Sequence, residues 1–146
     1  METCLNSHLS GKWYQIARSR INLKNDFSES LFYLSISCEN NYDLLFVGIN
    51  YDRSKIIKKF SMKIISKKEE TILMIKNRCF LKRFRLLLHD KENDILIISD
   101  MRYKHILILS KKSSVNHEIM ELSLSKIDFC KFDVTDIRLY SSSIID

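Results

Sequence analysis

Apolar and polar residues alternate with a period of two along most of the first part of the chain, which is the pattern of half-buried β-strands. The clearest case is residues 57–66, where Phe60, Met62 and Ile64 alternate with lysine and serine. Eight strands are predicted, over residues 12–18, 31–39, 43–51, 57–66, 71–76, 84–89, 94–99 and 104–110. Short strands at regular spacing, joined by polar turns, predict an all-β meander that is closed as a barrel or folded as a sandwich.

The pattern changes to a helical one after these strands. Asn116 can cap a helix, because its side chain accepts a hydrogen bond from the exposed amides of the first turn. Met120, Leu124 and Ile127 then recur at spacings of four and three residues, as on one face of an amphipathic helix. The sequence therefore predicts a helix over residues 114–128, packed against the outside of the strands, and a short final strand over residues 137–141.

The basic charge of the chain has two interpretations. The formal net charge is +6, which fits an anionic partner, but a codon bias towards Ile, Lys and Asn would give the same balance. Lysine and arginine are concentrated in residues 55–59 and 76–85, where Phe80 and Phe84 lie among them. These two clusters could bind nucleic acid or an anionic membrane. No known nucleic-acid motif accompanies them, so a nucleic-acid partner is not expected.

Candidate chemistry is sparse. The four cysteines (Cys4, Cys38, Cys79 and Cys130) have no metal-ligand spacing, and they are interpreted as free buried thiols or as two disulfides. The four histidines (His8, His89, His105 and His117) have no acid or nucleophile at a characteristic spacing. We therefore predict no catalytic residue, no cofactor and no metal site.

The cellular location is left open by the sequence. No run of about 18 apolar residues is present, and the N-terminus lacks the basic and apolar regions of a secretory signal. Either the protein is cytoplasmic, or the sequence starts after a removed signal. In the second case Cys4 is a candidate for lipidation.

Four stretches resemble the lipocalin family, and they extend over nearly the whole chain. Residues 11–18, Gly-Lys-Trp-Tyr-Gln-Ile-Ala-Arg, are similar to the start of bacterial outer-membrane lipocalins and apolipoprotein D. Asp90 matches the first residue of the family's Asp-x-x-Tyr turn, although Asn93 replaces the tyrosine. Residues 108–111 resemble the family's Ile-Leu-Ser-Arg, with Lys111 in place of arginine, and residues 132–137 resemble its Phe-Asp link before the last strand.

This resemblance implies one domain, an eight-stranded antiparallel up-and-down β-barrel with one outer helix. Residues 1–8 would be an N-terminal extension, 9–111 the barrel, 114–128 the helix and 137–141 the final strand. Gly11 would bend the chain across the closed end, and Trp13 would plug that end. Lys111 would lie over the tryptophan, keeping the charge of arginine without its planar stacking.

The resemblance also implies a binding function, in which the barrel carries or sequesters a fatty acid, a lysophospholipid or a similar apolar molecule. Inward-facing strand positions are the candidates for ligand contact, and they are Phe46, Phe60, Met62, Met74, Phe84, Leu86 and Leu107. Lys63, Arg83 and Arg85 are candidates for an acidic headgroup at the mouth. An interior cysteine, Cys38 or Cys79, would be the alternative basis for an enzyme, and some bacterial relatives form homodimers.

Overall fold

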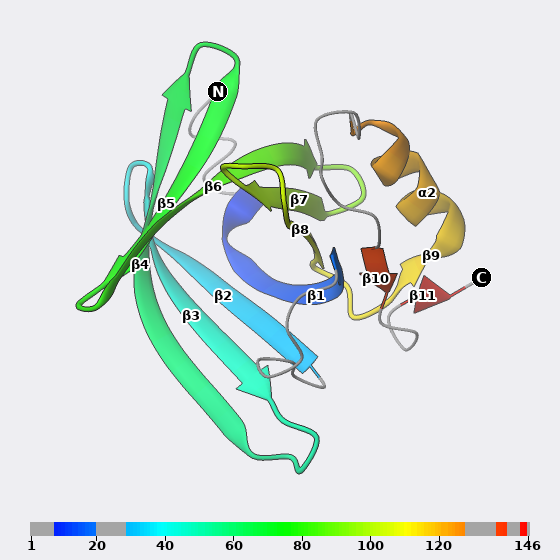
Figure 1. Ribbon diagram of the computed structural model, residues 1–146, viewed down its shortest axis with the longest axis horizontal. Coiled ribbons are helices and arrows are strands. Elements are labelled where there is room, and N and C mark those ends of the chain that lie inside the picture. The colour runs from blue at the N-terminus through cyan, green and yellow to red at the C-terminus, as the bar shows by residue number, and fades with distance from the viewer. Residues whose placement is uncertain (1–7, 20–28, 128–136, 140–143, 146) are drawn as a thin grey trace.

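Eight antiparallel strands form a closed barrel, as predicted (Figure 1). The computed structural model describes residues 8–19, 29–127, 137–139 and 144–145. The barrel strands are β1 (Gly11–Ser19), β2 (Glu29–Cys38), β3 (Asn41–Ile49), β4 (Lys55–Lys67), β5 (Glu70–Asn77), β6 (Phe80–Asp90), β7 (Ile95–Asp100) and β8 (Ile106–Ser110). Each strand pairs with the next one along the chain, and β1 also pairs with β8, which closes the sheet.

Strand β1 closes the barrel because it pairs both with β2 and with β8. Its first residues, from Gly11 to Tyr14, pair with β2, and its later residues pair with β8. A register shift between Gln15 and Ala17 inserts Ile16 as an extra residue, which is a β-bulge. Beyond such a bulge the inward and outward positions of a strand exchange, and this exchange decides the position of Arg18, described below.

Tight turns join the strands although the chain has only two glycines. Among the residues that the structure describes, five others have positive φ angles, and each lies between two barrel strands: Asn40, Arg53, Lys68, Asp94 and Tyr103. In an up-and-down meander, alternate turns lie at the same end of the barrel. The β2–β3, β4–β5 and β6–β7 turns therefore lie at one end, and the β3–β4, β5–β6 and β7–β8 turns at the other.

Two hydrophobic clusters lie on opposite faces of the sheet. The inner cluster includes Leu9, Trp13, Met62 and Leu96 and fills part of the barrel. The outer cluster includes Ile16, Ile95, Ile97 and Ile108, and it packs beneath the helix. A second bulge, between Leu86 and Leu88, places Leu88 against the outer cluster. Simple alternation from Phe84 and Leu86 would place Leu88 on the inner face with them, and this is wrong because alternation does not allow for the bulge.

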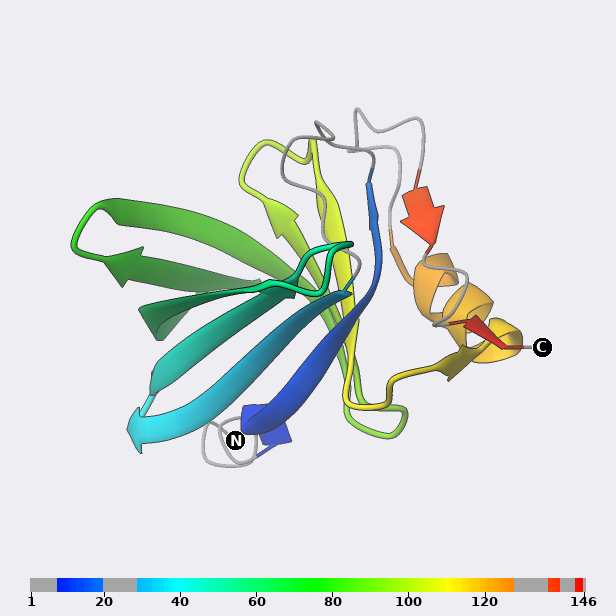
Figure 2. The same cartoon turned by 90° about the horizontal axis from the view of Figure 1, so that it is seen from below.

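Helix α2 (His117–Ser125) follows the short strand β9 (Val115–Asn116) and covers the outside of the barrel at β1, β7 and β8 (Figure 2). Asn116 caps it as predicted, because its side chain accepts a hydrogen bond from the amide of Glu118 at 2.7 Å. Met120 is buried against the outer cluster. The helix is shorter than the predicted 114–128, although Ile127 still packs against the same cluster.

Two short strands complete the described structure. β10 (Ile137–Leu139) pairs with Ala17 to Ser19 of β1, at the position of the predicted final strand. β11 (Ile144–Ile145) pairs in parallel with β9, which the sequence did not predict. Residues 132–136 and 140–141, which belong to the predicted link and final strand, lie outside the described residues. Within the described part of the chain, no helix has the length and apolar character needed to span a bilayer.

Candidate functional site

A tryptophan lies at the closed end of the barrel. Trp13 has no exposed surface, and its indole Nε1 donates a hydrogen bond to the carbonyl of Leu9 at 2.8 Å. The Lys111 Nζ lies 5.3 Å from the centre of the Trp13 ring, within cation–π range. Gly11 has a φ of +127°, a conformation that a side chain would strain. The chain therefore bends at Gly11 before it continues into Trp13.

The β6–β7 turn at the same end is organised by Asp90. One carboxylate oxygen of Asp90 accepts hydrogen bonds from the amides of Glu92 and Asn93, both at 3.1 Å. The other oxygen accepts one from the Asn93 side chain at 2.9 Å. These contacts, the Asn93 side chain first, lower the pKa of Asp90 below its usual value. Asn93 therefore binds Asp90 directly. It occupies the position that is tyrosine in the Asp-x-x-Tyr turn that this segment resembles.

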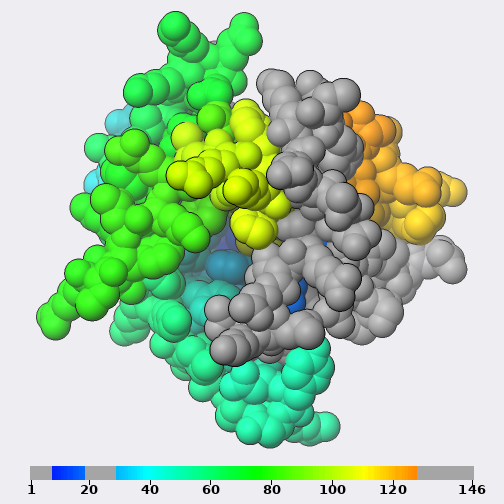
Figure 3. All heavy atoms as spheres, in the orientation of Figure 1, coloured from blue at the N-terminus to red at the C-terminus, as the bar shows by residue number. Residues whose placement is uncertain are grey.

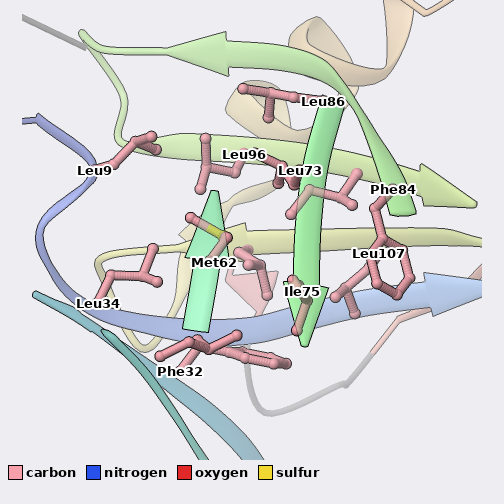
Figure 4. A pocket seen from close by; sticks show the side chains of 13 residues that line it. Leu9, Phe32, Leu34, Met62, Leu73, Ile75, Phe84, Leu86, Leu96 and Leu107 are labelled. Atoms are coloured by element: carbon pink, nitrogen blue, oxygen red, sulfur yellow. The ribbon is translucent and has the colours of Figure 1, made fainter. Parts of the chain in front are cut away.

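A wholly apolar cavity of about 190 Å³ lies inside the barrel (Figure 4). Thirteen side chains line it, and none of them has a nitrogen or oxygen atom: Leu9, Phe32, Leu34, Leu44, Met62, Leu73, Ile75, Phe84, Leu86, Leu96, Ile98, Leu107 and Leu109. Binding sites for drug-sized ligands have volumes of about 300–1,000 Å³. The cavity therefore suits a narrow apolar group, which would find no hydrogen-bond partner among these side chains.

A second hollow, of about 310 Å³, lies next to the cavity at the open end. The side chains of Phe84, Ile98 and Leu107 line both, so the two hollows adjoin. The second hollow adds polar and charged side chains, and they are Gln15, Arg18, Lys82, Ser99, Asp100 and His105. The space-filling view shows a hollow between the β3–β4, β5–β6 and β7–β8 hairpins, with atoms of β1 and β2 at its bottom (Figure 3).

Solved structures with the same architecture exist. Lobster apocrustacyanin A1 matches with a TM-score of 0.70 and 14% identity, over 94% of this chain and 79% of that one. The siderocalin Ex-FABP, described as functioning through dual ligand specificities, matches with a TM-score of 0.67 and 14% identity, over 95% and 99%. No protein-family model matches the sequence, and no curated protein matches it. The chain has the lipocalin fold.

Four of the side chains predicted to contact a ligand line the cavity of this lipocalin barrel: Met62, Phe84, Leu86 and Leu107. Phe60 packs against the inner cluster outside the lining, and the Phe46 ring lies 5.2 Å from that of Phe32. Met74 does not line the cavity, because both of its neighbours on β5 do and side chains alternate along a strand. Ligand contact by these residues stays a prediction.

The three basic residues predicted at the lipocalin mouth do not gather there. Lys63 pairs with Asn41, beside the β2–β3 turn at the closed end. Arg85 is bound to Glu70 by a salt bridge and lies 4.7 Å from the Tyr103 ring centre. Arg83 is exposed and borders a third, shallow hollow. The position of these residues along the sequence did not predict which of them lie at the mouth, because the strands are staggered around the barrel.

Arg18 is the mouth residue that the sequence analysis missed. It is only 7% exposed, and it lines the charged hollow together with Gln15. Strict alternation from Trp13 places residue 18 on the outer face, but the bulge at Ile16 returns it to the inner face. Two apolar residues in succession, Ile16 and Ala17, are the only local sign of that bulge.

A pair of histidines lies near the closed end. The rings of His8 and His89 have centroids 4.9 Å apart, and the His8 Nε2 lies 3.0 Å from a carboxylate oxygen of Asp94. Both ring nitrogens of His89 are buried, with no hydrogen-bond partner among the described residues. Burial, with a smaller effect from His8, lowers the pKa of His89 to about 4. His89 is therefore neutral at physiological pH.

Cysteine chemistry inside the barrel is not supported. Cys38 and Cys79 are both free and exposed, at the end of β2 and in the β5–β6 turn. Of the two interpretations of the sequence, free thiols are correct for this pair and disulfides are not, but neither thiol is buried, because both lie where a strand meets a turn. Cys4 and Cys130 lie outside the described residues, and the described part of the chain holds no group of three metal-binding side chains.

Proposed function

We propose that this protein binds one single-chain amphiphile with an acidic headgroup, such as a fatty acid or a lysophospholipid, and carries or sequesters it. The observation behind the proposal is that the apolar cavity and the charged hollow adjoin, with Phe84, Ile98 and Leu107 lining both. An apolar chain fits the cavity, and an anionic group fits the charged hollow. The lipocalin fold, shared with a protein described as having two ligand specificities, supports a binding role.

The apolar part of the ligand would provide most of the affinity. Each buried methylene contributes about 0.8 kcal/mol, so eight of them contribute roughly 6 kcal/mol before the cost of association. Met62 is unbranched and adaptable, which lets the lining adjust to chains of different shape. We therefore expect a dissociation constant no tighter than micromolar, with tolerance for the structure of the ligand's apolar chain.

The headgroup would bind at Arg18 and Lys82. Arg18 is nearly buried beside the cavity, where a charge-assisted hydrogen bond is stronger than in open water. Asp100 lines the same hollow, so the site is not uniformly positive, and a headgroup would bind to the two cations and away from Asp100. This arrangement favours a carboxylate or a phosphate over a neutral alcohol.

Two finer points belong to the same proposal. Residues 11–18 support placing the protein near the bacterial outer-membrane and apolipoprotein D type of lipocalin. Binding without catalysis is supported by the exposed positions of Cys38 and Cys79 and by the neutral His89, which has no acid partner.

Displacement of a fluorescent fatty acid tests the proposal. We expect saturation near one ligand per chain, and tighter binding of a fatty acid than of the alcohol of equal chain length. Arg18→Met should remove most of this preference, whereas Arg102→Met, at an exposed position in the β7–β8 turn, should leave it unchanged. Thermal melting of both variants controls for folding. Failure of any apolar probe to saturate, or an unchanged preference in a folded Arg18→Met, would contradict the proposal.

A further inference from the structure

Two neighbouring segments at the open end of the barrel are exposed along their whole length. They are residues 51–59, in the β3–β4 turn and the start of β4, and residues 76–83, across the β5–β6 turn. We call them the rim segments. They lie close together, because the Phe80 ring of the second segment lies 5.6 Å from the ring of Phe60, the residue that directly follows the first segment. The hollow of Figure 3 opens between them.

The rim segments hold much of the protein's exposed apolar surface. Among the described residues, eight large hydrophobic side chains are exposed, and five of them are in the rim segments: Tyr51, Ile56, Ile57, Phe80 and Leu81. Ile57 is 59% exposed and Leu81 64%. Scattered apolar residues on a surface need no explanation, but a concentration at one edge marks an interaction site.

The same segments hold the net charge of the chain. They contain eight lysine and arginine residues and one acidic residue, Asp52, which gives net +7, whereas the whole chain has net +6. All other residues together are therefore close to neutral, at net −1. Asp52 accepts hydrogen bonds from the amide and hydroxyl of Ser54 within its own turn, at 2.9 and 2.6 Å. Codon bias explains a high lysine content but not its concentration at one end of the barrel.

We propose that the rim segments dock this protein on an anionic lipid bilayer, with the mouth of the barrel facing the membrane. Basic side chains are attracted to anionic headgroups, and adjacent apolar side chains enter the interface between headgroups and acyl chains. Ile56, Ile57 and Leu81 favour a bilayer over a nucleic acid, because aliphatic side chains do not stack on bases as aromatic ones do. A ligand could then pass between bilayer and cavity without crossing water.

Vesicle sedimentation measures this docking without requiring a ligand in the cavity. We expect binding to vesicles of phosphatidylcholine with phosphatidylglycerol, weak binding to phosphatidylcholine alone, and a decrease as salt is raised. Lys58→Glu with Arg83→Glu should weaken binding at least tenfold, since each basic side chain near an anionic surface contributes about fivefold. Lys67→Glu with Lys68→Glu makes the same change of charge in the β4–β5 turn at the closed end, and should have a much smaller effect.

The apolar contribution has its own pair of variants. Ile57→Ser with Leu81→Ser should weaken vesicle binding about tenfold or more, because both side chains are exposed and available to enter the interface. Leu122→Ser on helix α2, where the leucine is 52% exposed, should leave binding unchanged. All of these positions are on the surface, so the variants should fold.

The orientation is tested with the two exposed cysteines, which lie at opposite ends of the barrel. Cys79 is in the β5–β6 turn within a rim segment, and Cys38 is at the closed end of β2. Each is kept in turn while the other cysteines are changed to serine, and an environment-sensitive dye is attached. On anionic vesicles, the dye at Cys79 should shift to the blue and the dye at Cys38 should not.

Several results would overturn the docking proposal. These are absence of vesicle binding, equal losses in rim and closed-end variants, a blue shift at Cys38 instead of Cys79, or oligonucleotide binding that the rim charge variants abolish while the apolar variants retain it. Fatty-acid displacement in the absence of vesicles separates this failure from failure of the ligand proposal. Rim variants that lose vesicle binding should still bind the free fatty acid.

Discussion

The inner and outer clusters of this barrel differ in the shape of their side chains and in how completely they are packed. Ile16, Ile95, Ile97 and Ile108 of the outer cluster have no exposed surface, and helix α2 covers them. The inner cluster is lined mainly by leucine, phenylalanine and methionine and encloses the cavity of about 190 Å³. We infer that the outer cluster stabilises the fold. The inner cluster is less completely packed, and this leaves the space that a ligand needs.

Adjacent isoleucines on β7 provide the largest test of this difference. Ile97 is fully buried in the outer cluster, whereas the half-buried Ile98 lines the cavity. Ile97→Ala should lower the free energy of unfolding by about 3–4 kcal/mol, because it leaves a void in a solid core. Ile98→Ala should cost about half as much, since its side chain already borders empty space. Chemical denaturation measures both, and equal losses would remove the distinction between the clusters.

The pH dependence of stability tests the buried histidine at the closed end. The pKa of His89 is about 4 in the folded protein, and that of an unfolded histidine is 6.5. Between these pH values the unfolded chain takes up a proton that the folded one does not, so stability falls as pH decreases from 6.5 to 4. The loss should reach about 3 kcal/mol and then level off for this group.

His89→Leu should flatten the stability curve between pH 4 and 6.5. Carboxylates such as Asp90, whose pKa is lowered in the folded protein, lose their contribution at lower pH, so the two effects separate. His117→Leu, at an exposed position on α2, is the matched control and should keep the slope. An unchanged slope in His89→Leu would show that the buried ring does not govern acid stability.

The helix cap tests whether the outer cluster is independent of the cavity. Asn116→Ala removes the hydrogen bond to the Glu118 amide and should cost about 1 kcal/mol of stability, whereas Asn116→Asp should retain most of it. Displacement of a fluorescent fatty acid should be the same in both variants, because the helix does not line the cavity. A change in affinity would show that the clusters are coupled.

The smallest effect is expected where Lys111 covers Trp13. Lys111→Met removes the cation but keeps most of the aliphatic chain, and it should lower stability by about 0.5–1 kcal/mol. Lys111→Arg should match or exceed the stability of the natural protein, since guanidinium stacks better on an indole. Thermal melting distinguishes the three proteins. A Met variant as stable as the natural protein would show that the contact contributes nothing.

Strand positions were predictable from the sequence because alternation and polar turns are local properties. Each of the eight predicted strands overlaps an observed one, and the cap at Asn116 was correct. The same local rule failed at the bulges, where it placed Leu88 on the inner face and left Arg18 unrecognised. Bulges depend on how two strands pair, and a single strand's pattern contains little information about its partner's register.

By itself, the sequence determined an all-β meander with an outer helix, and residues 11–18 indicated how the closed end is built. Only the tertiary structure decided which of the apolar side chains surround empty space, and that Arg18 and Lys82 both line the hollow next to it. It also brought residues 51–59 and 76–83 together at one end of the barrel. The physical reason is that alternation assigns a residue to a face, whereas its depth along the barrel depends on strand stagger and register.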